Sequence, residues 1–106
     1  MAWVLVVVAG LFETAFAVSL KQSETFTRLW WSVSFITCAV VSFVLLSMAL
    51  KTLPVGTAYS VWVGVGAAGT VILGIILFKE PANALRLASI ALVIAGIAGL
   101  KVATPA

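Results

Sequence analysis

The chain of 106 residues has no histidine, and only 8% of its residues are charged. Without histidine it has no histidine-based metal site and no Ser-His catalytic pair. Its one cysteine, Cys38, lies in an apolar run, and we interpret it as a small apolar filler. A glycine-rich phosphate loop is also absent. These absences argue against an enzyme, predict no cofactor, and leave an ion gradient as the energy source for any active process.

The scarcity of charge indicates a membrane protein, because a soluble domain usually carries about 25% charged residues. Hydrophobic residues make up 64% of this chain. We therefore expect it to be solvated mainly by lipid, with residues 1–106 forming a single domain. The first apolar stretch lacks a basic start and a convincing Ala-x-Ala cleavage site. We interpret it as a retained transmembrane helix rather than a signal peptide.

Four apolar stretches are long enough to cross a bilayer, since a helix needs about 20 residues to do so. Short polar or turn-forming segments separate them, and Asn83 is predicted to cap the last helix. The predicted fold is all-α, with four transmembrane helices, short loops and both termini on one side. The predicted spans are approximately residues 2–20, 29–50, 56–78 and 84–102.

The basic residues are distributed with only a weak bias between the two sides of the predicted bundle. The side that carries more of them is weakly favoured as cytoplasmic by the positive-inside rule. Two interpretations remain open: a single orientation with both termini outside, or insertion in both orientations. The terminal side carries Lys51 and Lys101, and the other side carries Lys21, Arg28, Lys79 and Arg86.

A single carboxylate, Glu13, interrupts the first span. A carboxylate near the centre of a bilayer costs roughly 2.5–3.5 kcal/mol. Glu13 lies roughly 18 Å along its helix, close to the midplane of a hydrocarbon core about 30 Å thick, so it cannot reach the headgroups. Its helical neighbours Ala9, Gly10 and Ala17 are small, which leaves room for another helix or a ligand, and Phe16 adds an aromatic wall.

The second and third spans offer polar and aromatic partners for this carboxylate. Ser42 is the hydroxyl nearest the middle of the second span, although it can instead bond its own backbone carbonyl four residues back. Tyr59 and Trp62 share a face of the third span, deeper than an interfacial aromatic belt. Gly64 and Gly66 follow, and they predict either a helix bend or close packing against a neighbour.

A buried acid, aromatic faces and a hydroxyl together are typical of a site for an organic cation. Ring faces attract cations, by about 2 kcal/mol or more when the pair is desolvated. A buried carboxylate without a counter-ion tends to hold a proton, so proton and cation compete for it. This competition suffices for antiport by alternating access, without a nucleotide.

Small residues recur every fourth position in the last span, at Ala91, Ala95 and Gly99. Such a ridge lets two membrane helices approach closely. We expect a dimer to form through it, because four short helices can hardly enclose a pathway alone.

The segment KTLPVGTAYSVWVGVGA, with Glu13 and four spans in 106 residues, resembles the small multidrug resistance family over nearly the whole chain. The resemblance implies an antiparallel, dual-topology homodimer in the bacterial inner membrane. It also implies that the membrane glutamate binds both proton and substrate, and that the protein exports cations by exchanging inward- and outward-open states.

The family includes exporters of guanidinium and exporters of bulky hydrophobic or quaternary ammonium cations. LPVGTAY, GVGAAG and GLK in this chain resemble the guanidinium branch. That branch typically has tryptophan at the position of Phe16. Phenylalanine has no N–H for the carboxylate, so the pocket becomes larger and more apolar and larger alkylated cations become acceptable. The likeness implies a site of Glu13, Ser42, Tyr59 and Trp62, with Gly10 opposite the acid.

The expected partners are protons, an organic cation, lipid and a second copy of the chain, and not nucleic acid. A quaternary ammonium or multidrug exporter is the alternative within the family. In another class, the chain is a structural or heteromeric-partner membrane protein in which Glu13 only joins helices. A channel, which would conduct without obligatory exchange, is a third possibility.

Overall fold

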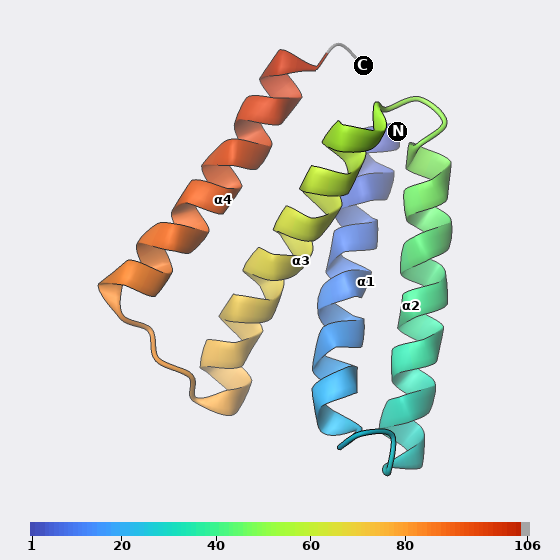
Figure 1. The fold of residues 1–106 in the computed structure, drawn as a ribbon, viewed down its shortest axis with the longest axis vertical. Helices are drawn as coiled ribbons and strands as arrows, with labels where there is room; N and C mark the ends of the chain where they lie inside the picture. The colour runs from blue at the N-terminus through green and yellow to red at the C-terminus, as the bar shows by residue number, and fades with distance from the viewer. Residues whose placement is uncertain (105–106) are drawn as a thin grey trace.

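The computed structural model describes residues 1–104 and shows four helices in an up-and-down arrangement (Figure 1). Among these residues there is no β-strand. Each helix is long and apolar enough to cross a membrane. The expected all-α fold of four membrane-spanning helices with short loops is confirmed. The helices are α1 (Ala2–Gln22), α2 (Leu29–Ala49), α3 (Val55–Phe78) and α4 (Ala84–Ala103).

Four of the eight helix ends coincide with the predicted spans, and the other four differ by one or two residues. α1 continues to Gln22, because polar side chains at a helix end can remain helical while reaching the interface. α3 begins at Val55, directly after Pro54, which fixes the backbone for a helix start. Asn83 caps α4 as predicted, since its Oδ1 accepts the N–H of Arg86 at 2.9 Å.

α1 packs against both α2 and α3, whereas α4 leans away and contacts α3 (Figure 1). Small residues permit the close approach of α1 and α3. A Cβ built on Gly10 would lie 2.6 Å from Cβ of Val65 and 3.2 Å from the carbonyl oxygen of Trp62. The buried core therefore lies between the first three helices. It includes Val6, Ala9, Ala49, Ala58 and Val61.

The loop between α1 and α2 has an unusual backbone. Glu24, Thr25 and Phe26 have φ angles of 49°, 62° and 65°, in the left-handed region that costs a non-glycine residue about 1–2 kcal/mol. Ser23, which is fully buried, holds this loop. Its Oγ accepts the N–H of Phe26 at 3.2 Å, and its carbonyl accepts the N–H groups of residues 27 and 28. The loop thus has a defined shape that fixes the position of Phe26.

Candidate functional site

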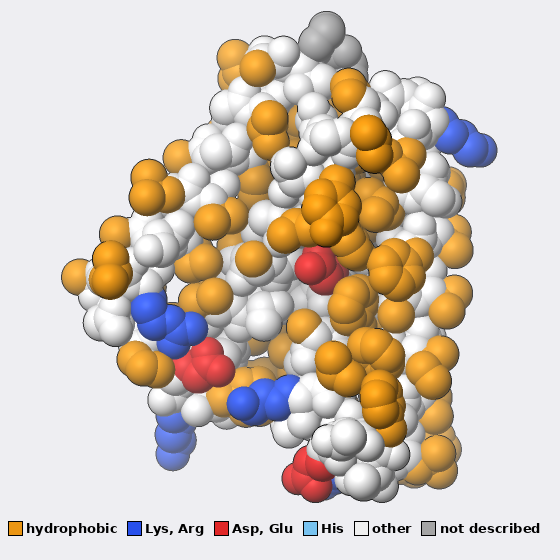
Figure 2. Space-filling view, viewed as in Figure 1, with side chains coloured by type: hydrophobic (Ala, Val, Ile, Leu, Met, Phe, Trp, Pro, Cys, Tyr) orange, Lys and Arg blue, Asp and Glu red, His pale blue; other side chains and the backbone are white. Residues whose placement is uncertain are grey.

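The structure places Glu13 of α1 against α3, where Gly66 makes room for it. A Cβ at position 66 would overlap the carboxylate of Glu13. The Oε2 atom of Glu13 is buried and has no hydrogen-bond partner within residues 1–104. Figure 2 shows acidic atoms in the middle of a largely apolar face, with basic side chains towards its edges. One carboxylate oxygen is therefore buried without a hydrogen-bond donor from the described residues.

Ser42 of α2 connects three helices through hydrogen bonds to α1 and α3. It is fully buried, and its hydroxyl donates to the carbonyl of Ala9 on α1 at 2.7 Å. The indole N–H of Trp62 on α3 donates to the same hydroxyl at 2.9 Å. Ser42 bonds α1 in this way rather than its own helix, and the bonds fix the orientation of the Trp62 ring.

Aromatic rings continue from Trp62 in two directions. The ring centroid of Tyr59 is 5.8 Å away, and that of Phe43 is 5.5 Å away. The centroids of Phe43 and Phe16 are 6.0 Å apart, so Phe43 links the predicted pair on α3 to the predicted ring on α1. Sequence reasoning missed Phe43, because one more aromatic residue in an apolar helix carries no distinguishing signal except its spacing of eight from Phe35.

The predicted glycines each face a different neighbour. Gly10 lies against Val65 of α3, whereas a Cβ on Gly64 would lie 2.8 Å from Cδ1 of Ile97 on α4. α3 is continuous through Gly64 and Gly66. In this structure these residues therefore provide close approach rather than a break in the helix.

A second residue that sequence reasoning missed is Thr14, which is 6% exposed. Its hydroxyl lies 3.1 Å from the carbonyl oxygen of Gly66, to which it donates, and a Cβ on Gly69 would overlap this hydroxyl. Thr14 thus ties α1 to α3 one residue after Glu13. Its sequence signal is weak, since most threonines inside helices bond their own backbone.

The predicted interface residues lie apart from these groups. Ala91, Ala95 and Gly99 are exposed on α4, and a Cβ on Gly99 would meet no described atom within 4 Å. The ridge is therefore open to another membrane helix.

Within residues 1–104, no group of three or more His, Cys, Asp or Glu side chains could hold a metal ion. The other two acids lie outside the membrane-spanning helices. Glu80 pairs with Arg86 at 3.1 Å, and Glu24 lies 4.0 Å from Arg28. Glu13 is thus the one acidic group of the described chain that lies within a membrane-spanning helix.

The sequence was compared with those of known proteins. A family profile described as Small Multidrug Resistance protein matches residues 1–93. A guanidinium exporter from Escherichia coli K12 is 53% identical over 104 residues, which cover 98% of this chain and 99% of the relative. Guanidinium exporters from Salmonella typhimurium LT2 and Proteus vulgaris are 52% identical over 101 residues and 51% identical over 104 residues. The Salmonella alignment covers 95% of this chain and 96% of the relative. The Proteus alignment covers 98% of this chain and 100% of the relative.

The relatives are bacterial and are named exporters. Together with four membrane-spanning helices, this identifies a multi-pass transporter of the bacterial inner membrane. The profile match over most of the chain and the identity above one half show that the chain belongs to the small multidrug resistance family.

Proposed function

We propose that this protein is a proton-coupled antiporter that exports guanidinium and substituted guanidinium ions. The observation that carries the proposal is the half-buried Glu13 carboxylate within a span, which packs against Gly66 and whose buried Oε2 has no hydrogen-bond partner within residues 1–104. The names of the relatives support guanidinium as the cargo.

Proton and cation share Glu13 in this proposal. A guanidinium ion can donate two parallel N–H bonds to one carboxylate, which gives it geometric selectivity over a spherical cation. A proton neutralises the same carboxylate and removes its attraction for the cation. Acidification therefore weakens cation binding, and a proton gradient directed inwards drives the cation out.

Trp62 and Tyr59 supply the aromatic wall of the proposed pocket. The bond from the Trp62 N–H to Ser42 holds the indole in place before the cation arrives, which lowers the entropy lost on binding. Phe16 has no N–H to offer the acid, so its ring adds apolar surface without a hydrogen bond. This favours guanidinium ions with alkyl or aryl substituents beside guanidinium itself, and it admits hydrophobic quaternary ammonium ions.

The transporting unit in this proposal is an antiparallel homodimer that inserts in both orientations. The open ridge of Ala91, Ala95 and Gly99 supports it. The bias of the basic residues, two at one end and four at the other, is weak enough to be compatible with both orientations.

The test is cation-coupled current in proteoliposomes adsorbed to a supported membrane. We expect currents with guanidinium from the native protein and none from Glu13→Gln, which keeps the shape of the side chain but cannot bind a proton and a cation in turn. Glu24→Gln, which removes a largely exposed loop carboxylate, is the matched control and retains the currents.

Each alternative predicts a different result. Currents with a tetraalkylammonium ion and none with guanidinium would indicate the multidrug branch. Guanidinium current without movement of protons in the opposite direction would indicate a channel. Absence of current from a folded native protein would indicate a structural role for Glu13 or a requirement for a second, different chain.

A further inference from the structure

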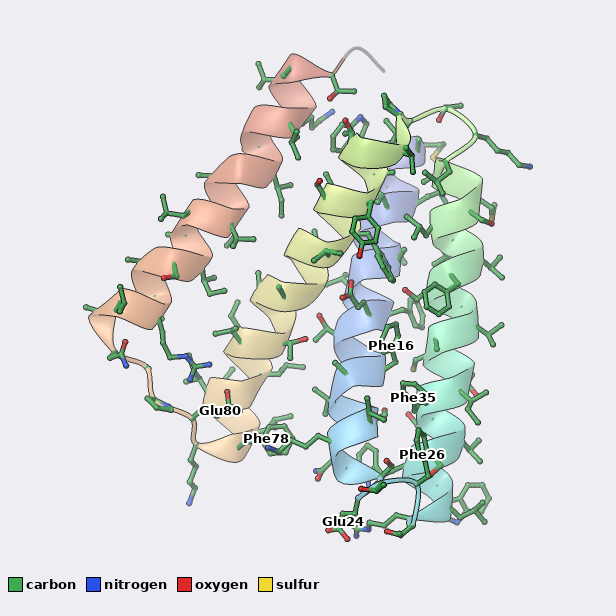
Figure 3. All side chains as sticks on the ribbon, viewed as in Figure 1. Phe16, Glu24, Phe26, Phe35, Phe78 and Glu80 are labelled. Carbon is green, nitrogen blue, oxygen red and sulfur yellow. The ribbon has the colours of Figure 1, made fainter. Side chains whose placement is uncertain are left out.

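The row of rings does not stop at Phe16. The ring of Phe35 on α2 lies 5.7 Å from that of Phe16, edge to face at 88°. Phe26 in the α1–α2 loop follows at 5.7 Å from Phe35. Figure 3 shows Phe16, Phe35 and Phe26 one after another, from the middle of the bundle to the end that carries this loop.

The complete row has six rings in contact, and it runs through three helices and a loop. Its five centroid separations of 5.5–6.0 Å give a contour of about 30 Å, comparable with the thickness of the hydrocarbon core. Its two ends are open, since Tyr59 is 57% exposed and Phe26 is 56% exposed. In order the rings are Tyr59, Trp62, Phe43, Phe16, Phe35 and Phe26.

The spacing of the rings matches the range of their attraction for a cation. A cation within about 6 Å of a ring centroid is attracted to the face of that ring. A cation that moves along the row is therefore always within reach of a ring. Phe16 and Phe35 meet edge to face at 88°, so the two ring faces of this pair are not stacked on each other.

The position of Phe26 does not follow from core packing. Its ring is largely exposed, yet it is held against Phe35 by three successive left-handed residues and by the bond of its N–H to Ser23. Strained backbone of this kind persists only where the surrounding structure determines it, and it is concentrated at ligand-binding sites.

Positive charges at this end of the row are directed to other groups. Lys21 places its Nζ over the ring of Phe78 at 4.9 Å, and Phe78 belongs to α3 and not to the row. Arg28 lies 4.0 Å from the carboxylate of Glu24. The Glu24 carboxylate partly offsets the charge of Arg28, which lowers the electrostatic repulsion that an incoming or departing cation would meet here.

We propose that Phe35 and Phe26 form a second, weaker site for organic cations, on the route between Glu13 and the α1–α2 end of the membrane. The site takes singly charged planar cations, namely guanidinium and its alkyl or aryl derivatives, through ring faces alone. The inference rests on the proposed export function and adds a route to it.

The experiment measures initial guanidinium flux in proteoliposomes for the native protein, Phe35→Leu and Phe26→Leu. Leucine keeps apolar bulk but removes the ring face, so each change lowers the flux about three- to tenfold. Equilibrium binding of guanidinium at Glu13, measured by calorimetry, changes less than about twofold because the main site is intact. Phe12→Leu is the matched control, since Phe12 lies on α1 outside the row, and it leaves the flux unchanged.

A series of fluorinated phenylalanines at position 35 separates cation attraction from packing. Fluorine weakens the attraction of the ring for cations while the ring keeps nearly the same shape. Flux therefore falls stepwise with the number of fluorine atoms. Equal flux across the series, or an equal loss in Phe35→Leu and Phe12→Leu, would overturn the proposal. A native protein without guanidinium flux would instead reject the export function itself.

Discussion

The first three helices bury apolar side chains against one another, whereas α4 leaves most of its apolar side chains exposed. α1, α2 and α3 enclose the buried residues of the chain and are joined by the hydrogen bonds of Ser42 and Thr14. None of the residues of α4, all of which the structure describes, is buried. α4 contacts α3 where Ile97 and Val93 lie against Gly64, among other places.

The difference shows where a membrane protein needs specific contacts. Lipid covers an exposed apolar helix at no cost, so α4 is stable without a core of its own. Small residues on a membrane helix stabilise the protein only when another helix packs closely against them. The three packed helices therefore hold the site rigidly within one chain, and α4 remains available for a second chain.

The largest effect is expected from a change on α4 that leaves the packed helices untouched. Gly99→Leu adds bulk to the open ridge, so we expect dimers to dissociate at least tenfold more readily, or about 1.4 kcal/mol, and transport to be lost with them. Native mass spectrometry of the purified protein measures the dimer fraction. Gly56→Leu adds the same bulk at another position with no described atom within 4 Å and leaves the dimer intact. An unchanged dimer in Gly99→Leu would place the interface on another surface.

The next largest effect is expected at the contact between Glu13 and α3. Gly66→Ala places a methyl group where the carboxylate now lies. A carboxylate is the flexible end of its side chain, so Glu13 moves and the fold survives. Guanidinium binding, measured by calorimetry, then weakens by about tenfold, or 1.4 kcal/mol. Gly96→Ala, on the open side of α4, is the control and retains native affinity. Loss of folding in Gly66→Ala would contradict this account.

A smaller effect is expected from Ser42→Ala, which removes the group shared by three helices. The Trp62 N–H and the Ala9 carbonyl both lose a partner, which lowers the free energy of unfolding by about 1 kcal/mol. Thermal unfolding in detergent measures the change. Ser47→Ala is the control, because its exposed hydroxyl bonds only the carbonyl of Val44 in its own helix. Equal stability of the two variants would show that the bridge contributes little.

The smallest effect is expected from Thr14→Val, which removes one bond between α1 and α3. Bonds of this kind between membrane helices contribute about 0.6 kcal/mol on average. Thr70→Val is a close control, because the Thr70 hydroxyl donates to the same Gly66 carbonyl from within α3. We expect Thr14→Val to unfold more readily than Thr70→Val in the same detergent series. The opposite order would assign the structural role to Thr70.

Much of the fold and part of the site follow from local patterns. The lengths of the four apolar runs predicted four helices, and Asn83 predicted a cap that the structure contains. Glu13 could be singled out because a carboxylate within an apolar helix is costly wherever the helix packs. The sequence could not single out the other rings of the row, because aromatic residues are common in membrane helices and the contacts of these rings join several segments. These rings are Phe43, Phe35 and Phe26.

The sequence by itself determined that this chain crosses the membrane four times, that it carries one acid within a span, and that it resembles a family of cation exporters. These properties depend on composition, span length and local motifs, which are fixed before the helices meet. Only the tertiary structure decided which oxygen of Glu13 lacks a partner, which backbone Ser42 bonds, and how six rings from distant positions join. Those features depend on distances of a few ångströms between helices, which the packing of Gly10, Gly66 and Thr14 sets.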